Sequence, residues 1–202
     1  MLRGTPVLAV RRYISKINLK NMKEVSINKN MHLSEHLASP SSAALSHSSK
    51  LDGLRLSPHF TLGELCKTSV KTEDGNIPSH AHIENLKNLC ENWLEDLRYS
   101  HNTLYGDKDE PIVITSGYRS LEVNKRVGGS PTSNHLTGCA VDIRCYGIEQ
   151  AIRYASILLD IADGTKRDYD ELLIERSAKG NYWIHFAVRP ANNRRKTAFI
   201  SN

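Results

Sequence analysis

The stretch Ser133-Asn-His-Leu-Thr-Gly-Cys-Ala-Val-Asp-Ile143 carries the pattern on which the interpretation of this 202-residue chain depends. It contains His135 and Asp142, seven residues apart, and a glycine between them that can reverse the chain. A second histidine follows in Trp183-Ile-His185. Two imidazoles and one carboxylate suit zinc, and a catalytic zinc takes three protein ligands and keeps a fourth position for water. We therefore expect a metal site formed by His135, Asp142 and His185.

The strand pattern around these residues allows them to converge. Residues 139–145 form an apolar run that predicts a strand, and successive side chains of a strand point to opposite faces. If Ile143 faces the core, Asp142 faces the other side. The same alternation in residues 182–188 directs His185 away from the core. Both side chains can then reach one ion from the same face of a sheet.

Helical and strand-like patterns alternate along the rest of the domain. Apolar residues recur at three- and four-residue spacing in 81–101 and 147–161, which predicts two amphipathic helices. Short helices are expected after Thr61, which begins a capping-box pattern with Glu64, and over 121–127. Strands are expected at 111–115, 139–145, 171–175 and 182–188. This order favours an α+β fold with a mainly antiparallel sheet flanked by helices.

Charge divides the chain near Leu51. Residues 1–50 contain 8 of the 27 Lys and Arg but 2 of the 22 Asp and Glu, whereas the other residues contain 19 basic and 20 acidic side chains. The tail is thus +6 and the remainder −1, so a nucleic-acid partner is not expected. The serine-rich stretch 34–50 cannot bury enough apolar surface to order itself. We predict a disordered leader and linker over 1–50 and one domain over 51–202.

The leader resembles a targeting segment only in its composition. Its apolar run 6–10 is too short for a secretory signal and ends at Arg11-Arg12. A mitochondrial presequence shares this composition, and a disordered leader is the simpler interpretation. No apolar run is long enough to span a bilayer, so we expect no integral membrane segment.

The remaining cysteine and histidine residues do not predict a second metal site. The four cysteines lack C-x-x-C spacing, which argues against a structural zinc held by thiolates. The seven other histidines are isolated and are expected to be structural, with His80-Ala-His82 an adventitious metal clip at most.

Three motifs in this order resemble the zinc D-Ala-D-Ala carboxypeptidase family. They are Ser116-Gly-Tyr-Arg119-Ser, Ser133-x-His135-x-x-Gly138-x-Ala140-x-Asp142 and Trp183-x-His185. The resemblance covers about residues 54–190, and its middle motif is specific. Those enzymes share a fold with the hedgehog signalling domain, so the resemblance implies that fold here. The likeness is greatest to compact cell-wall peptidases of bacteria and phages, which include endolysins.

The resemblance implies a hydrolase that cuts peptide bonds in peptidoglycan stem peptides, with zinc (Zn2+) on the three predicted ligands. Zinc lowers the pKa of its bound water toward ~7 and polarises the scissile carbonyl. The likeness also implies that Arg119 and Ser133 contact the substrate, because a guanidinium can hold a carboxylate or an oxyanion. The alternative for Arg119 is a salt bridge that fixes its loop. The motifs do not distinguish a carboxypeptidase from an endopeptidase.

A general base must also stand near the metal. Many relatives have a glutamate three residues before the last histidine, where this chain has Tyr182. Other relatives carry the base on the preceding hairpin strand, where Glu175 is the matching candidate. Glu171 is the fallback, and a solvated surface position is the alternative for Glu175.

The loop of the hairpin decides where Glu175 points. A three-residue loop over 178–180, with Gly180 in the left-handed conformation, pairs Glu175 with Trp183 and places it on the face of the metal ligands. A two-residue turn over 179–180 pairs it with Ile184 and turns the carboxylate away. Both registers remain open at this point.

The expected partner is a peptidoglycan stem peptide, and the protein is expected to be a monomer. Without a secretory signal, the enzyme would reach the cell wall after lysis, as endolysins do. The main alternative is a non-catalytic binding or phage structural module that keeps the fold and the metal. A targeted or nucleic-acid-associated protein is a third interpretation, and it rests on the basic tail alone.

Overall fold

The computed structural model describes residues 53–73, 75–106 and 108–201 of the chain. The predicted leader over 1–50 and the predicted boundary near Leu51 lie outside these residues. The division into leader and domain therefore stays a prediction.

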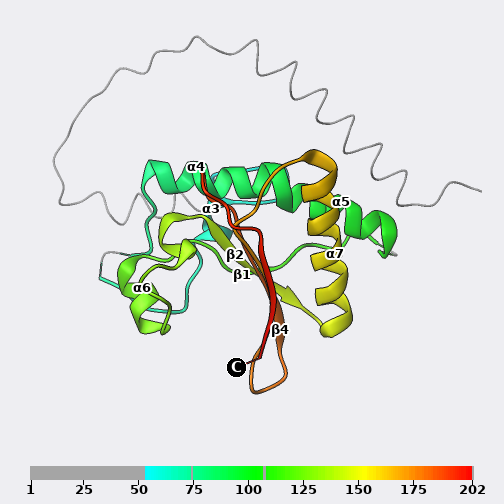
Figure 1. The fold of residues 1–202 in the computed structure, drawn as a ribbon. Helices are drawn as coiled ribbons and strands as arrows, with labels where there is room; N and C mark the ends of the chain where they lie inside the picture. The colour runs from blue at the N-terminus through cyan, green and yellow to red at the C-terminus, as the bar shows by residue number, and fades with distance from the viewer. Residues whose placement is uncertain (1–52, 74, 107, 202) are drawn as a thin grey trace, which may run out of the picture.

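A five-stranded sheet forms the centre of the described part (Figure 1). Its strands are β1 (Ile114–Ser116), β2 (Ala140–Cys145), β3 (Glu171–Arg176), β4 (Tyr182–Ala187) and β5 (Lys196–Ser201). They lie in the order β1-β2-β4-β3-β5, and neighbouring strands are antiparallel except β3 and β5, which are parallel. Together with the helices, this sheet confirms the expected α+β fold.

Two strand predictions need correction. Strand β1 begins at Ile114 instead of residue 111, because Pro111 has no N–H to donate and the β1–β2 register shifts between Ile114 and Ser116. Strand β5 has no counterpart among the predicted strands. Its sequence Lys196-Thr-Ala-Phe-Ile-Ser is largely exposed at the edge of the sheet, so a strong apolar pattern is missing.

The helices lie in the predicted segments with bounds that differ by a few residues, and the one over 134–137 has no predicted counterpart. They are α3 (Leu62–Leu65), α4 (His80–Leu89), the π-helical turn η1 (Cys90–Leu94), α5 (Glu95–Leu104), α6 (Leu121–Arg126), the 3₁₀ helix η2 (Asn134–Thr137) and α7 (Ile148–Thr165). The Thr61 side chain accepts a hydrogen bond from the backbone N–H of Glu64, as the capping pattern predicts.

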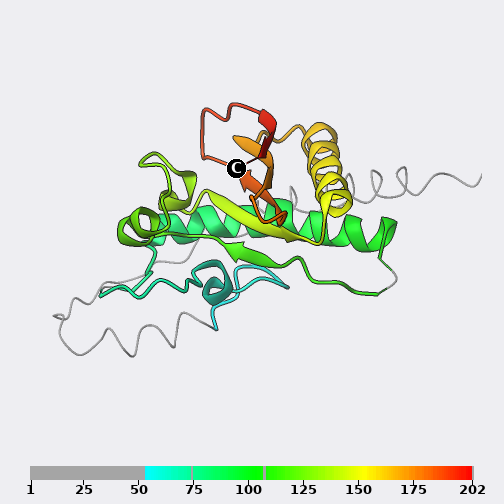
Figure 2. The same ribbon diagram turned by 90° about the horizontal axis from the view of Figure 1, so that it is seen from below.

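The helix expected over 81–101 is one continuous rod made of α4, η1 and α5, which runs alongside the sheet (Figure 2). A π turn takes in one residue more than an α turn and so shifts the side chains that follow it. Here Cys90, Trp93 and Leu94, all within the turn, are buried in the core. Helical periodicity predicts the rod but not this local widening.

Helix α7 covers one face of the sheet and packs against β2, β3, β4 and α5 (Figure 1). It continues beyond the predicted end at Ile161, and Gly164 lies within its last turn. The helix ends where Lys166 takes the left-handed conformation, with φ 60°. A glycine near a helix end is therefore not the residue that stops this helix.

The core between the helices and the sheet determines to which face of the sheet the side chains of β2 and β4 point. Phe186 of β4 lies 5.0 Å from Trp93 and 5.9 Å from Tyr169 between ring centroids, and it is fully buried. Because neighbours along a strand point to opposite faces, His185 is directed to the face that α7 does not cover. Ile143 is buried beside Asp142 on β2 in the same way. The predicted alternation in both strands is confirmed.

Gly138 joins the 3₁₀ helix η2 to strand β2 where another backbone lies very close. Its φ is +69°, and a Cβ added there would lie 2.5 Å from the carbonyl oxygen of His82 in α4. Only glycine meets both conditions without strain. The side chain of Asn85 also donates to the carbonyl of Thr137, at 2.9 Å, so α4 supports the loop that carries His135.

We expect Gly138→Ala to destabilise the fold by clearly more than the cost of its left-handed backbone, about 1–2 kcal/mol. The matched control is Gly128→Ala, because Gly128 has φ +72° with no atom within 4 Å of the added Cβ. Urea denaturation of both variants measures the difference in the free energy of unfolding. Equal losses would show that the approach of α4 is not a constraint.

Candidate metal centre

Three side chains from two distant segments meet at one point on the face of the sheet that α7 does not cover. His135, Asp142 and His185 each offer one ligand atom, and these atoms all lie within 4.8 Å of one another. Asp142 of β2 stands directly opposite His185 of β4 in the antiparallel pair. The distances to Asp142 Oδ1 are 3.2 Å from His135 Nε2 and 2.9 Å from His185 Nδ1. The structure thus brings the three predicted ligands together.

The His135 ring is fixed by its backbone surroundings. Ser133 caps η2, and its hydroxyl accepts the backbone N–H of His135 at 3.3 Å. The Nδ1 of His135 donates to the carbonyl oxygen of Gly117 at 2.6 Å, and the side chain is buried. A second partner of this kind sets the tautomer and orientation of a metal-binding histidine. Nε2 is therefore the atom that faces Asp142.

Asp142 divides its two oxygens between different partners. Oδ1 faces the two histidines, whereas Oδ2 accepts from Arg119 Nη2 at 2.6 Å. The Nε of Arg119 donates to Ser116 Oγ at 2.8 Å, so the guanidinium is held on two sides. Burial opposes the charged form of Asp142, but the two histidines outweigh it and hold the pKa of this carboxyl well below its usual range. Asp142 is an anion with one oxygen available at the meeting point.

His185 lies between two carboxylates. Its Nδ1 faces Asp142, and its Nε2 lies 3.6 Å from Glu171 Oε2. Burial disfavours the charged imidazole, but both carboxylates outweigh it and raise the pKa of His185 to about 9. A carboxylate behind a histidine is the usual outer partner of a metal ligand.

The buried carboxylate of Asp170 is linked to Glu171 through two partners that they share, Asn134 and Arg194. Asp170 has no exposed surface and accepts from Arg189, Arg194 and Asn134. Arg194 also lies 3.0 Å from Glu171, and Asn134 donates to it at 3.2 Å. The 3₁₀ helix that carries His135 is thereby connected to the strand that supports His185.

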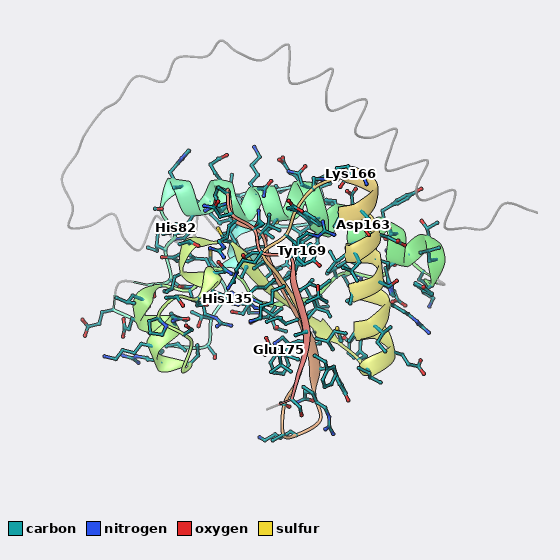
Figure 3. All side chains as sticks on the ribbon, viewed as in Figure 1. His82, His135, Asp163, Lys166, Tyr169 and Glu175 are labelled. Atoms are coloured by element: carbon teal, nitrogen blue, oxygen red, sulfur yellow. The ribbon has the colours of Figure 1, made fainter. Side chains whose placement is uncertain are left out.

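The two candidate bases have different surroundings. The hairpin has the three-residue loop, with Ser177 N–H bonded to Asn181, Gly180 at φ 82° and Glu175 paired with Trp183. This confirms the register that places Glu175 on the face of the ligands, and Figure 3 shows it with His135 on the side away from α7. The predicted two-residue alternative does not occur.

The pKa values of Glu171 and Glu175 are shifted in opposite directions. The hydrogen bond from His185 is the main cause that lowers the pKa of Glu171 to about 2, and Lys196 and Arg194 act in the same direction. Burial raises the pKa of Glu175, and the charges of Asp142 and Glu171 add to this rise, while His185 and Arg119 oppose it. Glu171 is thus held as an anion by its partners, whereas Glu175 is the more basic carboxylate.

The ligand atoms fit a zinc ion. With bonds of about 2.1 Å and tetrahedral angles, neighbouring ligand atoms lie roughly 3.4 Å apart. The separations of 3.2 and 2.9 Å from Asp142 Oδ1 are close to this value, and all three ligand atoms lie within 4.8 Å of one another. The donors are two imidazole nitrogens and one carboxylate oxygen, and each ligand has a second partner that orients it.

The site opens into a hollow of about 300 Å³. Arg119, Asp142 and Tyr118 line it on one side and the loop 67–70 on the other. A molecule in this hollow can therefore reach Asp142 from solvent. His135 and His185 do not line the hollow, so it reaches the candidate site from the side of Asp142.

Several contacts of the site are not visible in the sequence. The hydrogen bond from His135 to Gly117 and the ion pair of His185 with Glu171 join residues that have no characteristic spacing. His82, in the suggested clip, stacks on Tyr118 with ring centroids 5.2 Å apart and is not among the grouped metal ligands of the described residues. Its structural interpretation agrees with that contact.

A comparison with known proteins shows that part of the chain matches a family model. The sequence model of a family described as Peptidase M15 matches residues 58–166. This segment contains Arg119, His135 and Asp142 and ends before β3, so His185 lies beyond it. No curated protein matches the chain. Within the described residues, no helix has the length and apolar character needed to cross a membrane.

We expect Asp170→Asn to lower the free energy of unfolding by about 2 kcal/mol at neutral pH, because charge-assisted hydrogen bonds from two arginines are lost. The partners of Asp170 hold its pKa below the usual range, so its contribution is complete above the unfolded value of about 3.9 and is lost as pH falls through the folded value. The difference from wild type should therefore shrink below about pH 4.

Urea denaturation from pH 7 to pH 3, with a chelator present, measures this difference. Asp168→Asn is the matched control, because Asp168 forms an exposed pair with Arg195 that is worth little. A loss in Asp170→Asn no larger than in Asp168→Asn would contradict a stabilising role for the buried carboxylate.

Proposed function

This protein belongs to the Peptidase M15 family, and we propose that it hydrolyses peptide bonds in peptidoglycan stem peptides, with zinc bound by His135, Asp142 and His185. The family is shown because the matched segment, residues 58–166, is more than half of the chain. The family consists of peptidases that generally depend on zinc. The observation that carries the proposal is the convergence of three ligand atoms beside an open hollow. Zinc bound there would polarise the scissile carbonyl and activate a water molecule for attack.

Glu175 is the proposed general base. It shares the face of the ligands, is half-buried, and has a pKa raised by burial, so it is a better proton acceptor than a surface glutamate. Glu171 is instead occupied by His185, Arg194 and Lys196. We propose that Glu171 orients His185 and that Glu175 takes the proton from the attacking water.

Arg119 and Ser133 each make a hydrogen bond within the site and have a further donor that a substrate can use. Arg119 holds Asp142 through Nη2, which is the salt bridge considered as the alternative, but it also lines the hollow. Its Nη1 has no hydrogen-bond partner among the described residues and can donate to a substrate oxygen. Ser133 Oγ accepts from His135, and its hydroxyl hydrogen is available to a substrate. Substrate contacts are therefore proposed for both.

The expected loss of peptidase activity in Glu175→Gln is about 10²- to 10⁴-fold, the usual contribution of a general base, with zinc retained. His135→Ala should lose both activity and zinc. Glu171→Gln is the matched control for a carboxylate on the same face: it should weaken zinc binding by about 10- to 100-fold and regain activity at saturating zinc.

Chromatography of defined stem peptides after incubation, together with the zinc content of each variant, measures these outcomes. Full activity in Glu175→Gln would remove the assignment of the base. Absence of any cleavage by the zinc-loaded wild type would favour the non-catalytic module of the same fold.

Zinc binding should be coupled to the loss of a proton from His185. A histidine that binds a metal must be neutral, and the raised pKa of about 9 means that His185 is charged at pH 7. The zinc affinity should therefore rise by roughly tenfold per pH unit up to about pH 9 and then level off. In Glu171→Gln it should level off at a lower pH, because one of the two carboxylates that raise this pKa is lost.

Calorimetric titration in two buffers of different ionisation enthalpy counts the released protons. Zinc binding at pH 7 without proton release would contradict the assignment of His185 as a ligand. An unchanged pH profile in Glu171→Gln would contradict the role of that carboxylate.

A further inference from the structure

A second hollow, of about 630 Å³, lies at the hairpin end of strands β2 and β4. Its lining includes Thr115, Arg144, Tyr146, Tyr182 and Trp183. Thr115 also lines the hollow that opens on Asp142, so the two hollows are neighbours. The pair Arg144 and Trp183 lies two residues along the strands from the pair Asp142 and His185, so the second hollow lies beside the candidate site.

Arg144 is an unpaired cation in this extension. It follows Asp142 by two residues on β2 and so lies on the same face of the strand. Its side chain is exposed, and its guanidinium has no ion pair or hydrogen bond within 53–73, 75–106 and 108–201. Arg119 and Arg194, by contrast, are each paired with a carboxylate near the site. A free guanidinium in a hollow is suited to an anionic ligand.

Aromatic side chains line the same hollow as Arg144. Trp183 pairs with Arg144 across the strands and with Glu175 on its other side, and it is half-buried. Tyr146, two residues beyond Arg144, is 77% exposed. Exposed aromatic rings provide flat apolar contact surface at little entropic cost. With Tyr182, the lining of the hollow thus combines one positive charge with three aromatic side chains.

We propose that this hollow is a substrate subsite in which Arg144 binds a carboxylate of the peptide while Trp183 and Tyr146 pack against the peptide on either side. The inference rests on the proposed function and adds a preference for acidic peptides. Two residues of a strand span about 7 Å, and an extended peptide advances by a similar amount for two residues. The recognised carboxylate should therefore lie about two residues from the cleaved bond.

The carboxylate has two chemical sources, an acidic side chain or the free C-terminus of the peptide. Four peptides of one sequence separate them: the acid form, its side-chain amide, its C-terminal amide and the doubly amidated form. We expect one of the two single amides to have a KM about tenfold higher than the acid form, which corresponds to one charge-assisted hydrogen bond. That amide identifies the source.

The variant Arg144→Gln should reduce this tenfold preference to nearly one, and Arg144→Lys should keep part of it. Arg153→Gln is the matched control, because Arg153 is exposed on α7 and lines neither hollow. A preference that survives in Arg144→Gln, or an equal rise in KM for all four peptides, would overturn the subsite.

A binding measurement distinguishes failure of the subsite from failure of the proposed function. The chelated full-length protein is titrated with the same four peptides while the fluorescence of Trp183 is followed, and Trp183→Phe identifies the signal. Binding that depends on the carboxylate and on Arg144, without any cleavage by the zinc-loaded protein, would overturn the peptidase proposal and keep the subsite. Cleavage without such dependence would keep the peptidase and overturn the subsite.

Discussion

The antiparallel pairing of Asp142 with His185 is the constraint on which the rest of the site depends. Because these residues stand directly opposite each other, their side chains leave the sheet side by side and need no loop to bring them together. Their neighbours Ile143 and Phe186 point into the core on the other face. A slip of one residue in either strand would turn its charged side chain into the apolar core and its apolar neighbour out of that core, so the energy of the core fixes the geometry of the site.

A second constraint is that every ligand has one atom committed elsewhere. Gly117 holds His135, Arg119 holds Asp142, and Glu171 lies behind His185. These contacts come from two parts of the chain, the segment 117–119 and strand β3. Asp170 accepts hydrogen bonds from Asn134, next to His135, and from Arg194, which also contacts Glu171. Preorganisation of this kind reduces the side-chain freedom that metal binding would otherwise have to remove.

The sequence predicts those features that depend on local chemistry. The fold class and the family resemblance are confirmed. The sequence leaves the hairpin register open, because both candidate turns contain Gly180, and the structure has the three-residue loop. The partners of the ligands could not be predicted, because Asn134 and Asp170 are 36 residues apart and meet only after the sheet has formed. The same holds for strand β5, whose pairing depends on a free edge of β3 and not on its own apolar pattern. Ligand roles, the base and the substrate contacts remain proposals.

Strand β5 lies at the edge of the sheet, and its first residue and the loop before it contact two carboxylates close to the candidate site. Lys196 at its start contacts Glu171, and Arg194 and Arg189 in the preceding loop hold Asp170. Most of residues 190–195 are exposed, so a protease could reach this loop in the folded protein. A single nick there would leave all three ligands in the chain but separate the scaffold of His185 into two fragments. Cleavage of this short loop would therefore remove part of the support of the candidate site without changing any of its three proposed ligand residues.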